Sequence, residues 1–142
     1  MFRVISAFTL SCLCFSAPLF AKTYQTINVD QVLSIYDGDT FRVNLKDYPA
    51  LVGENIPIRV NGVDTPEIRG KCKREKQLAR KAKQFTVNQL RNAEQIKLVN
   101  VQRGKYFRIA ADVMVDGQNL ADLLIKANLG YPYTGGKKKP WC

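Results

Sequence analysis

The chain has 142 residues, of which 46% are hydrophobic and 24% are charged, a size and composition typical of one globular domain. Its formal net charge of +10 favours a polyanionic partner, such as nucleic acid, an anionic membrane surface or an acidic polymer. The chain contains no histidine, which excludes a histidine triad, a histidine general base and a histidine-ligated zinc site.

The first 21 residues have the features of an export signal. Arg3 provides a short positive region, residues 4–15 form a mostly apolar run, and small residues up to Ala21 offer a cleavage site. We expect a signal peptide over residues 1–21 and a mature domain over residues 22–142 that is secreted or periplasmic. The mature charge falls to +9, because the removed segment contains one arginine and no acidic residue. An uncleaved N-terminal anchor is the alternative.

Three strands are predicted at the start of the mature domain. The apolar positions between residues 24 and 36 predict the first strand. Asp37-Gly38-Asp39 predicts a hairpin turn after it, since Asp-Gly favours positive φ. Alternating apolar and polar residues predict two more strands over residues 41–46 and 56–63, and residues 47–55 between them are typical of a loop.

A basic helix is predicted over residues 73–91. Its apolar residues recur near helical spacing and predict a stripe that faces the core. This stripe consists of Leu78, Ala82, Phe85 and Leu90. The remaining surface is strongly cationic, which indicates either an ordinary solvated face or a surface that follows the phosphates of a nucleic acid. The cations are Lys71, Lys73, Arg74, Lys76, Arg80, Lys81 and Lys83.

Two further strands and a short helix complete the predicted elements. The strands cover residues 96–101 and 107–115, the helix covers residues 120–127, and residues 131–142 are predicted to be irregular. Five short strands with helices placed late in the chain indicate a small barrel.

The mature domain retains two cysteines, Cys72 and Cys142. In an exported chain an even pair predicts a disulfide, which here joins the C-terminal tail to the start of the basic helix. Two free thiols are the alternative.

Three stretches carry residues suited to phosphodiester chemistry. Residues 37–40 contain two carboxylates, residues 58–67 contain an arginine on a strand and two carboxylates on the following turn, and residues 105–108 end in a second arginine. Carboxylate and carbonyl oxygens suit Ca²⁺, Mg²⁺ or Mn²⁺, and the planar fork of arginine matches phosphate oxygens. We interpret the three stretches as one site in which a cation and two arginines face a phosphate.

Each of these residues also has an ordinary structural interpretation. Asp37, Asp39 and Asp64 are aspartates at turns, where the alternative is that their side chains only cap the turn. The alternative for Arg59 is that it is an ordinary exposed residue of a strand. The alternative for Arg108 is that it pairs with Asp112 on the same face of its strand.

The same stretches resemble a known family. DGDTFRV at 37–43, IRVNGVDTPE at 58–67 and KYFRIAADVMVDG at 105–117 are similar, in order and spacing, to the signature blocks of the staphylococcal nuclease-like (thermonuclease) family. The resemblance covers residues 29–130. It implies an α+β, mainly β fold: a five-stranded OB-like barrel with packed helices. It also implies a calcium-dependent hydrolase that cleaves DNA and RNA with little sequence preference. We expect a monomer without stable membrane association after signal cleavage.

The resemblance assigns a metal centre. Asp39 and Asp64 correspond to metal ligands of the family, and the main-chain carbonyl of Thr65 corresponds to a third ligand. Glu67 corresponds to the group that positions or deprotonates the attacking water.

The resemblance also assigns the phosphate contacts. Arg59 and Arg108 correspond to two arginines that bind the phosphate and stabilise the transition state, and Lys105 and Tyr106 match positions that contact a nucleotide phosphate. Phe107 departs from the family pattern, which usually has glycine there. We expect this bulky side chain to tilt Arg108 or to narrow the nucleotide pocket.

Two other functions fit parts of the sequence. One is an OB-like module that binds nucleic acid without cleaving it, for which Phe107 is the best support. The other is a cationic exported protein that acts on anionic membranes or cell-wall polymers. It has less support, because we find no basic amphipathic helix with an aromatic face.

Overall fold

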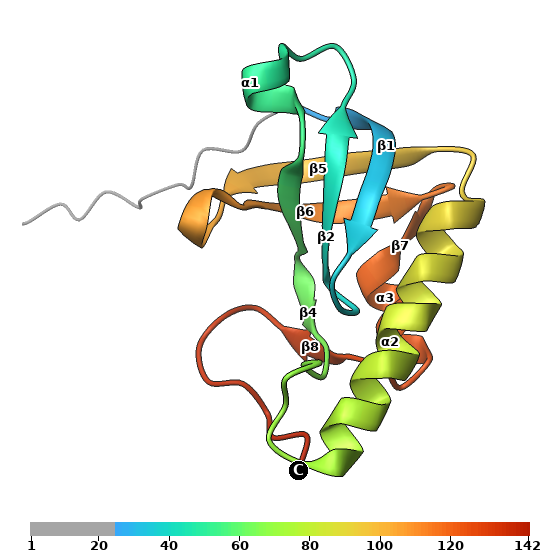
Figure 1. Ribbon diagram of the computed structural model, residues 1–142, viewed down its shortest axis with the longest axis vertical. Coiled ribbons are helices and arrows are strands. Elements are labelled where there is room, and N and C mark those ends of the chain that lie inside the picture. The colour runs from blue at the N-terminus through green and yellow to red at the C-terminus, as the bar shows by residue number, and fades with distance from the viewer. Residues whose placement is uncertain (1–24) are drawn as a thin grey trace, which may run out of the picture.

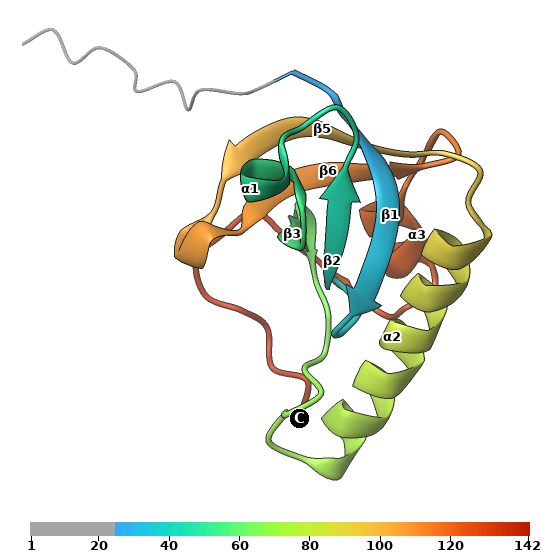
Figure 2. The ribbon, with the colours of Figure 1, turned by 45° about the horizontal axis from the view of Figure 1, so that its top comes forward.

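The computed structural model describes residues 25–142, so the predicted signal peptide over residues 1–21 lies outside the described residues. The described chain is organised around a closed barrel of five strands (Figures 1 and 2). The strands are β1 (Ile27–Ile35), β2 (Thr40–Leu45), β3 (Ile56–Val60), β5 (Ile96–Arg103) and β6 (Ile109–Val115). Neighbouring strands pair antiparallel, except that β3 and β6 pair in parallel and thereby close the barrel. The predicted OB-like, mainly β fold is confirmed.

Alternation along the strands fills the barrel interior with branched and aromatic side chains. Phe41 and Val43 on β2, Ile58 on β3, Leu98 on β5 and Val113 on β6 are almost completely buried. Burial of each such side chain stabilises the fold by about 1.5–3 kcal/mol. β1 does not alternate regularly, because two register shifts interrupt its pairing with β2 and bend the strand.

Two helices pack beside the barrel, and a third lies at the far end. α2 (Lys73–Asn92) runs along one side and contacts β1 and α3 (Leu120–Lys126), while α1 (Ala50–Gly53) lies at the end opposite the C-terminus (Figure 1). The predicted helices over residues 73–91 and 120–127 are therefore confirmed within one residue. α1 is a short helix inside the segment that was predicted to be a loop.

The core-facing stripe of α2 differs from the predicted one. Ala82 and Leu90 are buried as predicted, and Phe85 is half-buried and packs against the core. Leu78 is half-buried and is not part of the core cluster. The other buried positions are Glu75, Ala79 and Thr86. Small residues occupy this face because the β1–β2 turn approaches closely: a Cβ atom on Gly38 would lie 2.9 Å from Ala82 Cβ. Gly38 does not have the positive φ that Asp-Gly predicted, so glycine is required there by close packing.

The predicted third strand is in fact two strands. β3 ends at Val60, and after Asn61 the chain leaves the barrel at Gly62, whose φ is +79°. β4 (Gly62–Asp64) then pairs with β8 (Tyr131–Tyr133), so part of the tail predicted to be irregular is a strand. Leaving the barrel directs the end of β4 toward the C-terminal tail.

The β5–β6 connection also differs from the prediction. β5 continues to Arg103, and a 3-10 turn, η1 (Lys105–Phe107), precedes β6, so β6 begins at Ile109 and not at residue 107. The Gly104 N–H donates to Arg108 O at 2.7 Å and closes this hairpin. A two-residue strand, β7 (Gln118–Asn119), leads into α3.

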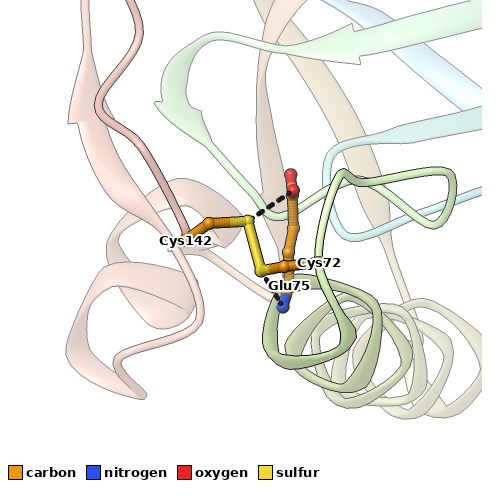
Figure 3. Close-up of side chains that lie close together, drawn as sticks. All are labelled: Cys72, Glu75 and Cys142. Atoms are coloured by element: carbon orange, nitrogen blue, oxygen red, sulfur yellow. Dashed lines mark hydrogen bonds between the residues drawn. A yellow bond between two sulfur atoms is a disulfide. The ribbon is translucent and has the colours of Figure 1, made fainter.

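The C-terminal tail lies beside the start of α2, where a disulfide joins Cys72 and Cys142 (Figure 3). This agrees with the bond predicted from the sequence. Glu75 is buried next to the bond, and its Oε2 accepts the Lys71 N–H at 2.8 Å. The side chains of Cys72, Glu75 and Cys142 are close enough together to resemble a metal-binding site, but the two sulfurs are bonded to each other and cannot act as thiolate ligands.

Within residues 25–142, no helix is long and apolar enough to cross a membrane.

Candidate active site

Two turns that lie far apart in the sequence meet at one end of the barrel. Asp39 ends the β1–β2 turn, and Thr65 follows β4. The Thr65 N–H donates to Asp39 Oδ2 at 2.9 Å, across a sequence separation of 26 residues. Within the first turn, the Asp39 N–H donates to Asp37 Oδ1 at 3.2 Å, and the Thr40 hydroxyl donates to Asp39 Oδ1 at 3.0 Å. These bonds fix the directions of the carboxylates.

Three of the carboxylates are withdrawn from solvent. Asp37 is 7% exposed, Asp39 3% and Asp64 2%. Burial raises the pKa of Asp37, and the positive charge of Arg59 opposes that rise. Each of these buried carboxylates favours a positive partner, because burial removes its hydration.

Arg59 provides part of the compensating charge. It lies on β3, where its backbone pairs with Thr40 of β2, and its half-buried side chain forms an ion pair with Asp39 and a longer one, of 3.5 Å, with Asp64. It also donates to Val63 O at 3.3 Å. Burial lowers the pKa of Arg59, while the carboxylates of Asp64 and Asp37 raise it. The predicted meeting of Asp39, Arg59 and Asp64 is therefore present in the structure.

A lysine that the sequence analysis did not assign to the site lies here as well. Lys138 Nζ is 2.8 Å from Asp64 Oδ1 and 3.0 Å from Glu67 Oε1. Partial burial lowers the pKa of Lys138, but its contacts with these two carboxylates outweigh that effect and raise it. Two features of the sequence could have indicated that Lys138 lies here: the run of three lysines in the tail, and the Cys72–Cys142 pair. A disulfide between these cysteines brings the tail to this turn.

The tail also covers the second oxygen of Asp64. The indole N–H of Trp141 points at Asp64 Oδ2 at 3.4 Å, and the Trp141 ring stacks on Tyr131 with a centroid distance of 4.0 Å. Trp141 is 9% exposed, so the last residues of the chain form one wall of the site.

The donor set fits a hard divalent cation. Asp39 and Asp64 offer carboxylate oxygens and Thr65 offers a main-chain carbonyl, the ligand types that Ca²⁺ and Mg²⁺ prefer. Thr65 is buried, and its Oγ1 has no hydrogen-bond partner among the described residues. Asp39, Asp64 and Thr65 would hold the ion, with Asp37 adding negative charge behind them.

The second arginine lies on the neighbouring strand. Arg108 directly precedes β6, and Ile109 of β6 pairs with Ile58 of β3, next to Arg59. The positive charge of Arg108 is close enough to contribute to lowering the pKa of Arg59. Arg108 Nε is buried without a hydrogen-bond partner in the part of the chain that the structure describes. Asp112, its alternative partner, instead accepts a hydrogen bond from Asn100 at 2.6 Å.

The remaining predicted residues lie on η1 and are open to solvent. Lys105 is exposed, Tyr106 is 85% exposed and Phe107 is 88% exposed. Tyr106 and Phe107 both have left-handed backbone conformations, with φ of 57° and 60°.

Phe107 faces an apolar groove of about 410 Å³ that Leu51, Val52 and Arg108 also line. A separate hollow of about 360 Å³ beside Arg59 is lined by Tyr133 and Gln102, and Phe107 is not among the described residues that line it. The bulky side chain therefore borders Arg108 and leaves the space next to Arg59 open.

The sequence matches the model of one protein family. The model of the family described as staphylococcal nuclease homologue matches residues 57–139. The matched segment includes Arg59, Asp64, Glu67, Arg108 and Lys138, and it begins after Asp39. A comparison with curated proteins gives no match.

Proposed function

Because the chain belongs to the staphylococcal nuclease family, we propose that it is an exported, metal-dependent endonuclease that hydrolyses phosphodiester bonds in DNA and RNA with little sequence specificity. One observation carries the proposal: Arg59 forms ion pairs with Asp39 and Asp64, two buried carboxylates that lie 25 residues apart in the sequence. A module that only binds nucleic acid gains nothing from carboxylates placed beside the phosphates.

Asp39, Asp64 and the Thr65 carbonyl are the proposed ligands of the metal. Their oxygens suit Ca²⁺, Mg²⁺ and Mn²⁺, and we take the metal to be calcium because the resemblance to the family implies it. When bound there, the cation supplies positive charge and polarises a phosphoryl oxygen. The hydrogen bond from the Thr65 N–H to Asp39 holds the two ligand turns together, so the ligands are fixed before an ion arrives.

Arg59 and Arg108 are the proposed phosphate ligands. Attack on a phosphodiester increases the negative charge on the phosphoryl oxygens, and fixed guanidinium donors stabilise that charge. Arg59 is held by Asp39 and Val63, whereas the Nε of Arg108 has no partner among the described residues. We assign Arg59 to orienting the phosphate and Arg108 to a contact that strengthens in the transition state. Lys105 and Tyr106, exposed beside Arg108, are the proposed contacts to a neighbouring phosphate.

Glu67 is the proposed group that positions or deprotonates water. Its side chain is 57% exposed, so an Oε atom can accept a proton from a water molecule that enters from solvent. Lys138 Nζ lies 2.8 Å from Asp64 Oδ1 and 3.0 Å from Glu67 Oε1, so both carboxylates border the same ammonium group.

The surface of α2 is the proposed path of the polyanionic substrate. Lys73, Arg74, Lys76, Arg80 and Lys81 are exposed on it, and such a surface attracts the phosphate backbone without reading its sequence.

Export and a monomeric state are part of the same proposal. The disulfide supports export, because such bonds persist in oxidising compartments. Mass spectrometry of protein recovered from the periplasm or medium should find an N-terminus at Lys22.

The activity is tested with purified mature protein on plasmid DNA and on RNA, in calcium, in magnesium and in EGTA. We expect degradation of both substrates in calcium and none in EGTA. Glu67→Gln should reduce the rate at least about 100-fold, because it removes the proton acceptor. The matched control is Glu54→Gln, an exposed residue beside α1, which should cleave at the wild-type rate.

Equal rates for the Glu67→Gln variant and the wild type would refute the assignment of Glu67. Tight DNA binding in calcium without loss of strands over hours would favour the binding module instead.

A further inference from the structure

The C-terminal tail contributes a cation to the proposed metal site. We infer that Lys138 is a tethered competitor of the metal ion: its ammonium group binds Asp64 and Glu67, and an ion that binds to Asp64 must displace it. This inference rests on the proposed function, from which it takes the metal site.

Both oxygens of Asp64 lie close to positive or polar groups of the protein, although Oδ1 accepts no hydrogen bond from the described residues. Oδ1 lies 2.8 Å from Lys138 Nζ and 3.5 Å from Arg59, and Oδ2 lies 3.4 Å from the indole nitrogen of Trp141. A cation that binds Oδ1 repels an ammonium group at this distance, since both are positive, and so favours its departure.

Lys138 is the donor that can leave. Its side chain is 44% exposed, compared with 19% for Arg59, and the whole Trp141 residue is only 9% exposed. A displaced ammonium group on a flexible four-carbon stem regains its hydration, whereas the less exposed Arg59 is also held by the Val63 carbonyl, which is not a proposed metal ligand. The exchange between metal and protein cation therefore takes place at Lys138.

The tail keeps the displaced lysine close to the site. Trp141, three residues after Lys138, is stacked on Tyr131, and Cys142 is bonded to Cys72. Three extended residues span about 10 Å, so the Lys138 backbone cannot move farther than that from Trp141. A tethered competitor has a high effective concentration, which weakens metal binding more than free cations in the buffer do.

The test measures calcium affinity, which is independent of nuclease activity. Isothermal titration with calcium should give about tenfold tighter binding for Lys138→Met than for the wild type, equivalent to about 1.4 kcal/mol. Lys137→Met is the matched control: it removes the same charge from the same tail, is exposed, and forms no ion pair within residues 25–142. It should bind calcium within about twofold of the wild type, since exposed charges contribute little. Lys138→Arg keeps the competing charge and should bind nearly as weakly as the wild type.

Terbium provides a second readout of the same site. Trp141 is the only tryptophan in the chain and lies against Asp64, so it is placed to sensitise terbium luminescence. Terbium titration should rank the variants in the same order as calcium.

The tether is tested by the Cys72→Ser/Cys142→Ser double variant. Where loss of the bond undocks the tail, which a red-shifted Trp141 emission reports, the effective concentration of Lys138 falls and calcium affinity should move toward that of the Lys138→Met variant. Where the tail stays docked, calcium affinity should remain at the wild-type value. This measurement tests the same competition if Lys138→Met does not fold, which melting curves of each variant would reveal.

The outcomes separate this inference from the proposed function. If the wild type binds calcium and cleaves DNA, but Lys138→Met binds calcium no more tightly, the inference is wrong and the nuclease assignment stands. An equal gain for Lys137→Met also overturns it, because overall charge would then explain the effect. If neither the wild type nor Lys138→Met binds calcium, the metal site and the inference both fail.

Discussion

Removal of the Cys72–Cys142 bond tests how the tail is held. The proposed change is Cys72→Ser/Cys142→Ser. Serine is chosen because Cys72 Sγ caps α2 by accepting the Glu75 N–H at 3.5 Å, and a serine hydroxyl can accept the same bond. Any loss of stability then reports the cross-link and not the helix cap.

The size of the effect follows from the loop that the bond closes. The two cysteines are 70 residues apart, and for a loop of this length the chain-entropy relation gives about 4.4 kcal/mol at 25 °C. For a domain of this size the same loss lowers the melting temperature by roughly 15 °C. The full effect requires that the tail remains docked in the variant. If the tail undocks, the loss equals only its docking free energy.

Equilibrium unfolding in urea distinguishes these cases. Far-UV circular dichroism reports the barrel, and the fluorescence of the single tryptophan, Trp141, reports the tail. We expect a loss near 4 kcal/mol with an unchanged native emission spectrum, or a smaller loss with a red-shifted one. A loss below about 1 kcal/mol with a native spectrum would refute the reasoning, because a docked tail without the bond must carry the full entropic cost.

Two further predictions concern residues near the site. Asp37→Asn should raise the melting temperature at pH 7, because burial raises the pKa of Asp37 and its charged form therefore destabilises the folded state. Below about pH 4 this gain should disappear, because the wild-type carboxyl group is then protonated in both the folded and the unfolded state. Phe107→Gly should raise the free energy of unfolding by about 1 kcal/mol, because Phe107 has a φ of 60° and is 88% exposed, so glycine relieves the backbone strain with little loss of burial.

Melting curves across pH 3–8 test the first of these, and a gain from Asp37→Asn that persists at pH 3 would contradict it. Urea unfolding tests the second. Its matched control is Tyr48→Gly, an exposed aromatic residue without a positive φ, which should not be stabilised.

The local spacing of apolar residues was sufficient to predict most of the helices and strands. Apolar spacing predicted α2 and α3 within one residue, and the apolar pattern located the five barrel strands, although the third divides and the bounds of others differ by a few residues. These features are readable because each depends on which face of its own helix or strand is apolar. The carboxylates and arginines were singled out because they lie in short stretches at turns and strand ends that resemble the family's signature blocks, and the structure brings Asp39, Arg59 and Asp64 together.

The tertiary structure decided what depends on contacts between distant segments. Gly38 is required by the approach of α2, and the third predicted strand divides because β4 pairs with a tail strand more than 60 residues away. Lys138 reaches Glu67 across 71 residues. No spacing within one segment encodes such a contact: it arises because closure of the barrel and the Cys72–Cys142 bond bring the tail to the end of β4, where a lysine from a charged run meets two carboxylates.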